Sequence, residues 1–325
     1  MATVRLGVIQ GTGRLYAGPT LVGVGQGYFA KQGLEIEVQQ VEGRAGIAML
    51  ATGELDVAPL GPGFYFFSDW SPAQPMVMVA DQGQMRPGRG SGAIVARPAL
   101  VESGALKDFP DLRGKRIGIS GDRGDHDWLT FAAALRRGGL TFDDVELVTT
   151  DFGDARHKAL AAGAIDVSTV GRLSSIMEGR AAGAFVAWKQ ESEVQPGRQQ
   201  FAVMFSHRFR TEQPDAAQRY VLAYLQGARD YYGAFENGAN RDAVVNVLAA
   251  QTDYEREAIA NQMVPTGVEP NGRLNLESIS ADLGWLQEQQ LVSPEITIAK
   301  VVDQRYLEQA LFELGPYAGP TAVAR

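Results

Sequence analysis

The stretch ATGELDVAPLG at residues 51–61 is repeated, with substitutions, as AAGAIDVSTVG at residues 161–171. The similarity extends upstream, because residues 29–53 and 135–163 share one order of features: a basic helix end, a glycine, a strand, a helix and a second glycine. An internal repeat reveals architecture before any single motif does. Alternating strands and helices are typical of α/β units. The sequence therefore predicts two α/β lobes, each containing one copy of the repeated unit.

Composition favours a globular protein of about two domains. Of the 325 residues, 45% are hydrophobic and 21% are charged, which are ordinary values. The formal net charge is −8, and the sequence has no stripe of basic residues that could neutralise the phosphates of a nucleic acid. We therefore exclude nucleic acid as a partner. No apolar run reaches the roughly 18 residues of a membrane-spanning helix. The chain has no cysteine, which excludes disulfides, thiolate zinc sites and cysteine nucleophiles.

The periodicity of hydrophobic residues and the positions of glycines predict the helices, the strands and the lobe boundaries. We expect strands at residues 4–9, 34–41, 55–60, 75–80, 93–96, 116–120, 145–149, 165–170, 184–187 and 201–205. We expect helices at residues 20–31, 44–52, 155–162 and 173–181, and an almost wholly helical region from residue 214 onward. Lobe one would combine residues 1–92 and 203–325, including a helical C-terminal extension, and lobe two would be residues 93–202.

Four motifs carry a resemblance to a known family. They are GYFAKQGLEIEV (27–38), LATGELDVA (50–58), DLRGKRIGISG (111–121) and LAAGAIDVSTVG (160–171). In order and spacing, over roughly residues 4–236, the chain resembles the NMT1/THI5-like proteins, the nitrate, sulfonate and pyrimidine-precursor group of the type II periplasmic-binding-protein fold. The resemblance implies two lobes, each a mixed sheet flanked by helices, with a ligand cleft between them and a helical C-terminal region.

Members of that group are mostly solute receptors of ABC importers, which close two lobes around a ligand. A few members are enzymes, namely desulfinases and pyrimidine-precursor synthases. The enzymes that look most similar rely on cysteine, either as a nucleophile or within a cysteine-rich motif. This chain has none. The resemblance therefore favours a receptor over an enzyme.

In the first lobe, candidate ligand contacts follow the strand ends, where open α/β sheets bind ligands. The loop QGTGRLY (10–16) supplies Gln10, Gly11, Thr12 and Tyr16, and its glycines suit either a close approach to a ligand or an ordinary turn. Gly61 and Phe64 belong to LGPGFYFFSDW (60–70). Aromatic side chains at this spacing either fill the core or line a pocket for an organic solute.

In the second lobe, SGDRGDHDW (120–128) joins a strand to a helix. Backbone N–H groups at Ser120 and Gly121 would form a seat for a polar ligand group. Asp122, Asp125 and Asp127 suit helix capping, but together they oppose a small inorganic anion unless Arg123 offsets them. We therefore expect a larger, neutral or zwitterionic organic ligand. His126 is a candidate hydrogen-bond donor to that ligand.

Three further candidates are Gly171, Arg172 and Trp188. Arg172 suits a bidentate pair with a carboxylate or phosphate, or else a solvated helix start. The acidic residues near His126 match neither a calcium loop nor a zinc pattern. No catalytic signature is present. We therefore expect no metal, no cofactor and no catalytic residue.

The predicted function is capture of a small organic solute, aromatic or heteroaromatic and with or without a carboxylate, for delivery to an ABC permease in the membrane. Two alternatives remain: an enzyme of the same fold acting on a small aromatic or pyrimidine-type substrate, and a receptor for a sulfonate or similar oxyanion. We expect a monomer. We expect it in the periplasm or in a membrane-anchored extracytoplasmic position, with its signal segment outside this sequence, or in the cytoplasm if Met1 is the native start.

Overall fold

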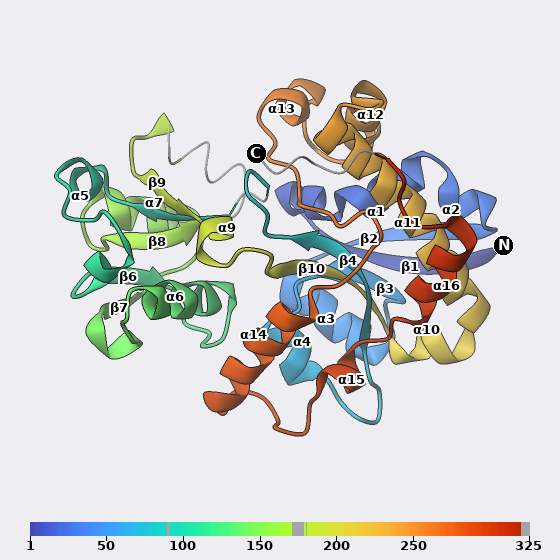
Figure 1. Ribbon diagram of the computed structural model, residues 1–325, viewed down its shortest axis with the longest axis horizontal. Helices are drawn as coiled ribbons and strands as arrows, with labels where there is room; N and C mark the ends of the chain where they lie inside the picture. Colours follow the sequence, from blue (N-terminus) through green and yellow to red (C-terminus); the bar gives the residue numbers. More distant parts are fainter. Residues whose placement is uncertain (90–91, 171–178, 180, 320–325) are drawn as a thin grey trace. The chain divides into compact units, whose positions relative to one another are not determined.

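A computed structural model describes residues 1–89, 92–170, 179 and 181–319, with the backbone alone at residues 11–13 (Figure 1). The chain divides into two compact units: unit 1 comprises Met1–Gln84 and Arg198–Arg325, and unit 2 comprises Met85–Gly197. The sequence analysis placed these divisions at 92/93 and 202/203. In the part of the chain that the structure describes, no helix is both long and apolar enough to cross a membrane.

Unit 1 contains a five-stranded mixed sheet. In spatial order its strands are β2 (Leu34–Val41), β1 (Ala2–Ile9), β3 (Val57–Leu60), β10 (Gln199–Phe205) and β4 (Val77–Gln84). Strand β1 pairs in parallel with β2 and β3, whereas β10 pairs antiparallel with both β3 and β4. Strand β10 comes from beyond unit 2 in the sequence, and in Figure 1 its olive ribbon lies within the otherwise blue sheet.

Unit 2 repeats this arrangement. Its strands, in spatial order, are β7 (Glu146–Thr149), β6 (Arg116–Ile119), β8 (Val167–Val170), β5 (Ala93–Ala96) and β9 (Val186–Gln190). Strand β6 pairs in parallel with β7 and β8, and β5 pairs antiparallel with β8 and β9. Each sheet thus places two antiparallel strands beside three parallel ones. The predicted fold class, α/β with two mixed sheets flanked by helices, is confirmed.

The repeated aspartate has the same structural task in both units. In unit 1, Asp56 Oδ2 accepts hydrogen bonds from the backbone N–H and the Nε of Arg5, at 2.8 and 3.0 Å. In unit 2, Asp166 Oδ2 accepts the corresponding bonds from Arg116, at 3.0 and 3.1 Å. Each aspartate N–H also donates to the carbonyl of its arginine. The repeat therefore encodes a side-chain tie between the central strand of each sheet and its neighbour.

A glycine in β1 and another in β6 each make room for the residue before that aspartate. A Cβ atom at Gly7 would lie 2.4 Å from Leu55 Cδ1, and one at Gly118 would lie 2.4 Å from Ile165 Cδ1. Contacts this short do not occur between real atoms, so a larger residue would displace the buried leucine or isoleucine. The two copies share this packing as well as their sequence.

Helices cover both faces of each sheet (Figure 1). The described helices of unit 1 are α1 (Gly18–Gly25), α2 (Tyr28–Lys31), α3 (Gly43–Thr52), α4 (Phe64–Asp69), α10 (His207–Glu212), α11 (Pro214–Asn237), α12 (Arg241–Gln251), α13 (Arg256–Asn261), α14 (Leu276–Glu288), α15 (Ile298–Val301) and α16 (Arg305–Leu314). In unit 2 they are α5 (Pro98–Glu102), α6 (His126–Arg137), α7 (Asp154–Ala161) and α9 (Glu191–Val194). The predicted helical C-terminal region is confirmed.

Two helix predictions need comment. The single helix expected at residues 20–31 is wrong, because Gly27 adopts a φ of 71° and divides it into α1 and α2. The helix expected at residues 173–181 falls almost entirely outside the described residues. The loop expected after β1 is instead a 3-10 helix, η1 (Gly11–Ala17).

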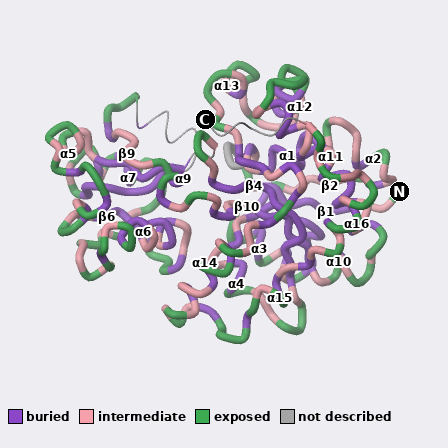
Figure 2. The backbone as a smooth tube through the Cα atoms, in the orientation of Figure 1, coloured by how far each residue is buried: buried purple, intermediate pink, exposed green. Residues whose placement is uncertain are grey.

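The core of unit 2 has two halves, one on each face of its sheet. Along β5, Ile94 and Ala96 pack in the cluster that contains Phe131 of α6. The alternating Ala93 and Val95 pack in the cluster that contains Leu160 of α7. This alternation follows from the two-residue period of a strand. The purple inner strands in Figure 2 show the same burial in both units.

Candidate functional site

After β1, Gln10 directly precedes η1, and Tyr16 lies near the end of η1. Gln10 is exposed, and its Nε2 donates to Glu42 Oε1 at 3.3 Å. The half-buried Tyr16 ring stacks on Phe201, with 4.7 Å between ring centroids. Its carbonyl accepts from Nε2 of the buried Gln82 at 3.1 Å. Gly11 and Thr12 lie on the same 3-10 helix. The interior of unit 1 therefore fixes the end of this loop that carries Tyr16.

The loop after β3 carries Gly61 and Phe64. A Cβ at Gly61 would lie 3.4 Å from the carbonyl oxygen of Gln200, so the chain passes close to β10 there. Phe64 begins α4 and is half-buried, with its ring 5.4 Å from that of Tyr65. The next two aromatic side chains, Phe66 and Phe67, are buried. The aromatic run thus divides into a core pair and a partly exposed pair at the strand end.

In unit 2, a buried carboxylate holds the turn after β6. The backbone N–H and the Oγ of Ser120 donate to Asp127, at 2.8 and 3.0 Å. The Nη2 of Arg156 in turn lies 2.6 Å from Asp127 Oδ2, and both side chains are almost completely buried. The Ser120 N–H is therefore occupied by the protein itself. Because Arg156 balances Asp127, this aspartate adds little net charge to the turn.

Gly121, next in the turn, is exposed, and its φ is not in the left-handed region. Arg123 is also exposed, and its guanidinium lies 5.8 Å from the centre of the Trp128 ring. Asp125 caps α6 by accepting the His126 N–H at 2.7 Å. Burial raises the pKa of the Asp125 carboxyl, although this hydrogen bond acts in the opposite direction.

His126 pairs with a buried glutamate. Its Nε2 lies 2.8 Å from Oε1 of Glu191, a side chain that is 2% exposed. The other oxygen, Oε2, has no hydrogen-bond partner among the described residues. A Cβ at Gly92 would lie 2.1 Å from that oxygen, so a larger residue there would displace the Glu191 carboxylate. The pair brings the first residue of α6 against the first residue of α9.

The remaining predicted residues have different surroundings. Trp188 lies on β9 and is half-buried, with its ring edge-on to Phe109 at 5.7 Å. It packs against the cluster formed around α6. Gly171 and Arg172 lie outside the described residues. The structure thus brings Ser120, Gly121, Arg123 and His126 together between the end of β6 and the start of α6 in unit 2. In unit 1 it places Gln10 just before η1 and Tyr16 near the end of η1.

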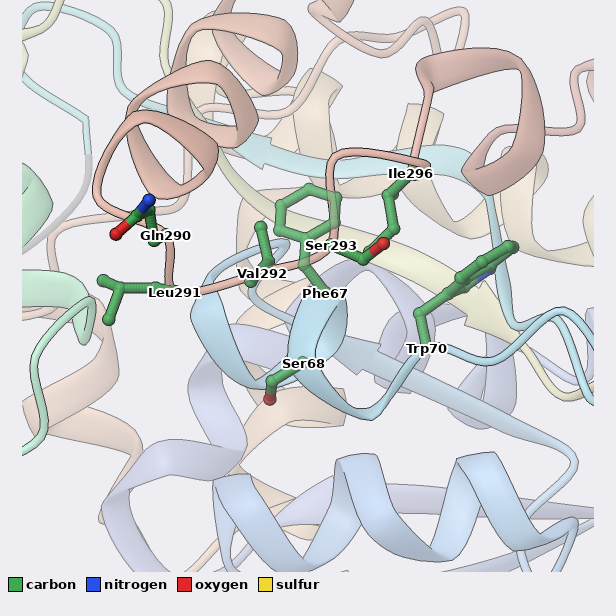
Figure 3. A pocket seen from close by; sticks show the side chains of 8 residues that line it. All are labelled: Phe67, Ser68, Trp70, Gln290, Leu291, Val292, Ser293 and Ile296. Carbon is green, nitrogen blue, oxygen red and sulfur yellow. The ribbon is translucent and has the colours of Figure 1, made fainter.

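A separate cavity of about 400 Å³ lies in unit 1, at the far end of α4 from Phe64 (Figure 3). Its lining residues are Phe67, Ser68, Trp70, Gln290, Leu291, Val292, Ser293 and Ile296. None of them is charged, and none is a predicted site residue. Within the described ranges, no group of three or more potential metal-ligating side chains is found.

The sequence of residues 15–234 matches the family described as NMT1/THI5 like. The chain belongs to the NMT1/THI5-like family. No curated protein sequence matches it. This family assignment agrees with the resemblance carried by the four motifs.

Solved structures place this NMT1/THI5-like protein within a known fold. The periplasmic aliphatic sulphonate-binding protein SsuA from Escherichia coli is 17% identical, with a TM-score of 0.70 over 94% of this chain and 92% of that one. The periplasmic nitrate-binding protein NrtA from Synechocystis PCC 6803 is 16% identical, with a TM-score of 0.69 over 97% and 89%. The desulfurization enzyme DSZB is 17% identical, with a TM-score of 0.63 over 96% and 99%. The protein therefore has the type II periplasmic-binding-protein fold.

Sequence reasoning missed two residues that shape the unit 2 turn of this NMT1/THI5-like protein. Arg156 lies in the helical stretch DARHKALA, 29 positions from Asp127. Glu191 follows β9 in a polar stretch and is 65 positions from His126. Local patterns carry no signal for pairs so far apart in the sequence.

Proposed function

We propose that this protein is the solute-binding component of an ABC importer. It captures a small organic solute, aromatic or heteroaromatic and with or without a carboxylate, and delivers it to a permease in the membrane. The observation that carries the proposal is the duplicated sheet. The two units share one strand order, and among the described residues polar and aromatic side chains follow β1 and β3 in unit 1 and β6 and β7 in unit 2. Loops at the carboxyl ends of such strands are where α/β sheets bind ligands.

The chemistry of these loops favours an organic solute over a bare inorganic anion. Tyr16 and Phe64 present partly exposed rings in unit 1. In unit 2, the buried Glu191 carboxylate lies next to the predicted seat, and Asp122 and Asp125 flank it. Negative charge there opposes nitrate or sulfate and favours a ligand with hydroxyl or N–H donors. A sulfonate receptor is the second candidate, because the sulphonate-binding protein SsuA shares the fold.

The proposal includes closure of the two units around the solute, as the family resemblance implies. It includes an extracytoplasmic location, in line with the periplasmic proteins that share the fold. It also includes a monomeric protein, with candidate contacts at Gln10, Gly11, Thr12, Tyr16, Gly61, Phe64, Ser120, Gly121, Arg123, His126, Gly171, Arg172 and Trp188.

Catalysis on the same scaffold is the competing function, because DSZB is an enzyme of this fold. The enzymes that this chain resembles rely on cysteine, and this chain has no cysteine with which to carry out the same chemistry. Calorimetric titration with a panel of aromatic acids and amides, followed by chromatography of the recovered compounds, separates the two functions. A receptor binds a panel member with a 1:1 stoichiometry and returns it unchanged. Steady conversion of a bound compound into a product would overturn the proposal.

A further inference from the structure

Phe152 lies at the same edge of the unit 2 sheet as the turn after β6, but it is not among the predicted site residues. Strands β6 and β7 run in parallel, with Ile119 paired to Thr149 at their last positions. The Thr150 N–H continues the pairing by donating to the Ile119 carbonyl at 2.9 Å. Phe152 follows two residues later, while Ser120 directly follows β6. The ring therefore belongs to the ligand-facing edge of this sheet.

The Phe152 side chain is exposed although it has an apolar ring. It is 54% exposed, so much of its apolar surface stays in water and contributes nothing to folding. A scattered exposed aromatic residue needs no explanation by itself. Phe152 differs because the Arg156 guanidinium carbon lies 3.8 Å from the centre of its ring. One face of the ring thus rests on a buried cation.

That cation is fixed in place. Arg156 Nη2 lies 2.6 Å from Asp127 Oδ2, and Nη1 donates to Thr169 Oγ1 at 2.9 Å. The backbone beside the ring is fixed as well, since Gly153 adopts a φ of 80° and its carbonyl accepts the Arg156 N–H at 3.0 Å. The ring therefore rests on a support that is itself fixed, which lowers the entropic cost of stacking a ligand on it.

The chemistry of a cation-backed ring indicates its ligand. Aromatic faces carry negative charge, and this charge repels the face of a second ring. A guanidinium on the inner face attracts that charge and so reduces the repulsion on the outer face. We propose that Phe152 is the platform on which the aromatic ring of the solute stacks, and that it selects flat, unsaturated rings over saturated ones. This inference rests on the proposed function and names the part of the protein that recognises the ring.

The test uses three pairs of probes that differ only in ring saturation: benzoate and cyclohexanecarboxylate, benzenesulfonate and cyclohexanesulfonate, and benzamide and cyclohexanecarboxamide. Calorimetry measures the affinity of the wild-type protein, of Phe152→Leu and of Phe312→Leu. Leucine keeps an apolar side chain but removes the ring. Phe312 is the matched control, because it is 86% exposed on α16 in unit 1.

We expect the wild type to prefer at least one aromatic probe over its saturated partner by about five- to tenfold, the size of an aromatic pair interaction. Phe152→Leu should abolish that preference and leave affinity for the saturated partner within about twofold. Phe312→Leu should change neither the preference nor the affinity for the saturated partner.

If aromatic probes bind and Phe152→Leu retains the preference, the inference is wrong while the receptor function stands. If the wild type binds the aromatic and the saturated member of every pair equally well, the inference is likewise wrong while the receptor function stands. If no probe binds the wild type, the proposed ligand class fails and the inference fails with it.

Discussion

At the scale of single residues, Asp127 and Arg156 determine how the unit 2 turn is built. We predict that Asp127→Ala destabilises the protein by about 3–5 kcal/mol, because it leaves the buried Arg156 cation without its partner. Urea unfolding monitored by circular dichroism measures the change. Asp154→Ala is the control, since Asp154 and Lys158 form an exposed pair that contributes less than about 1 kcal/mol. Equal effects of the two substitutions would contradict the structural account of the turn.

Gly121 allows a sharper test of the predicted ligand seat. Its φ is not left-handed, and a Cβ there would lie 3.5 Å from Thr149 Cγ2, an ordinary contact. Folding should therefore tolerate Gly121→Val, and the melting temperature without ligand should be nearly unchanged. If the backbone must approach the solute here, calorimetry should show an affinity loss of at least about tenfold. Unchanged affinity in the stable variant would place the seat elsewhere.

The residues that the sequence could and could not predict differ in a physical way. The placement of Ser120, Gly121 and His126 between one strand and one helix could be predicted, because a strand end and a helix start are visible in the local sequence pattern. The partners that hold them, Arg156 and Glu191, could not be found. A buried charge and a solvent-exposed charge look alike in a sequence, and only the fold brings distant residues into contact.

At the scale of elements, the Arg116–Asp166 tie between strands predicts a specific pH dependence. Burial opposes the charged form of Asp166, but hydrogen bonds and charge from Arg116 outweigh it and hold the pKa below its usual value. A lowered folded-state pKa adds stability above the unfolded pKa of about 3.9, and this stability is lost as the pH falls through the folded value. Asp166→Asn should therefore cost most at pH 7 and progressively less below about pH 4. Urea unfolding across this range would contradict the account if the cost were constant.

Among the helices and strands, some bounds could be predicted from the sequence, whereas the order of strands in the sheet could not. Strands 34–41 and 93–96 were predicted with the bounds that the structure has, because alternation and apolar runs are local signals. The position of β10 between β3 and β4 was not predicted. Its partners lie more than a hundred residues earlier in the chain, so the pairing follows from tertiary packing. The break at Gly27 was also missed, because a glycine inside an apolar helical pattern does not reveal its φ.

At the scale of the whole molecule, solute binding should compact the protein. Two units of matching topology, joined by two crossing segments, suit hinge closure. Small-angle scattering should therefore show a smaller radius of gyration when the tightest-binding probe is present at saturation. The same probe should leave the radius unchanged for a variant that no longer binds it. An unchanged radius for the wild type would count against closure, although not against binding.

Native mass spectrometry of the purified protein tests the central claim most directly, because it reports whether the chain carries a solute. The account predicts one small organic molecule per chain, released intact on denaturation and bearing an aromatic or heteroaromatic ring. After removal of that molecule by partial unfolding and refolding, adding it back should restore the same complex mass without any product. A bound inorganic anion, or a returned compound of altered mass, would contradict the account.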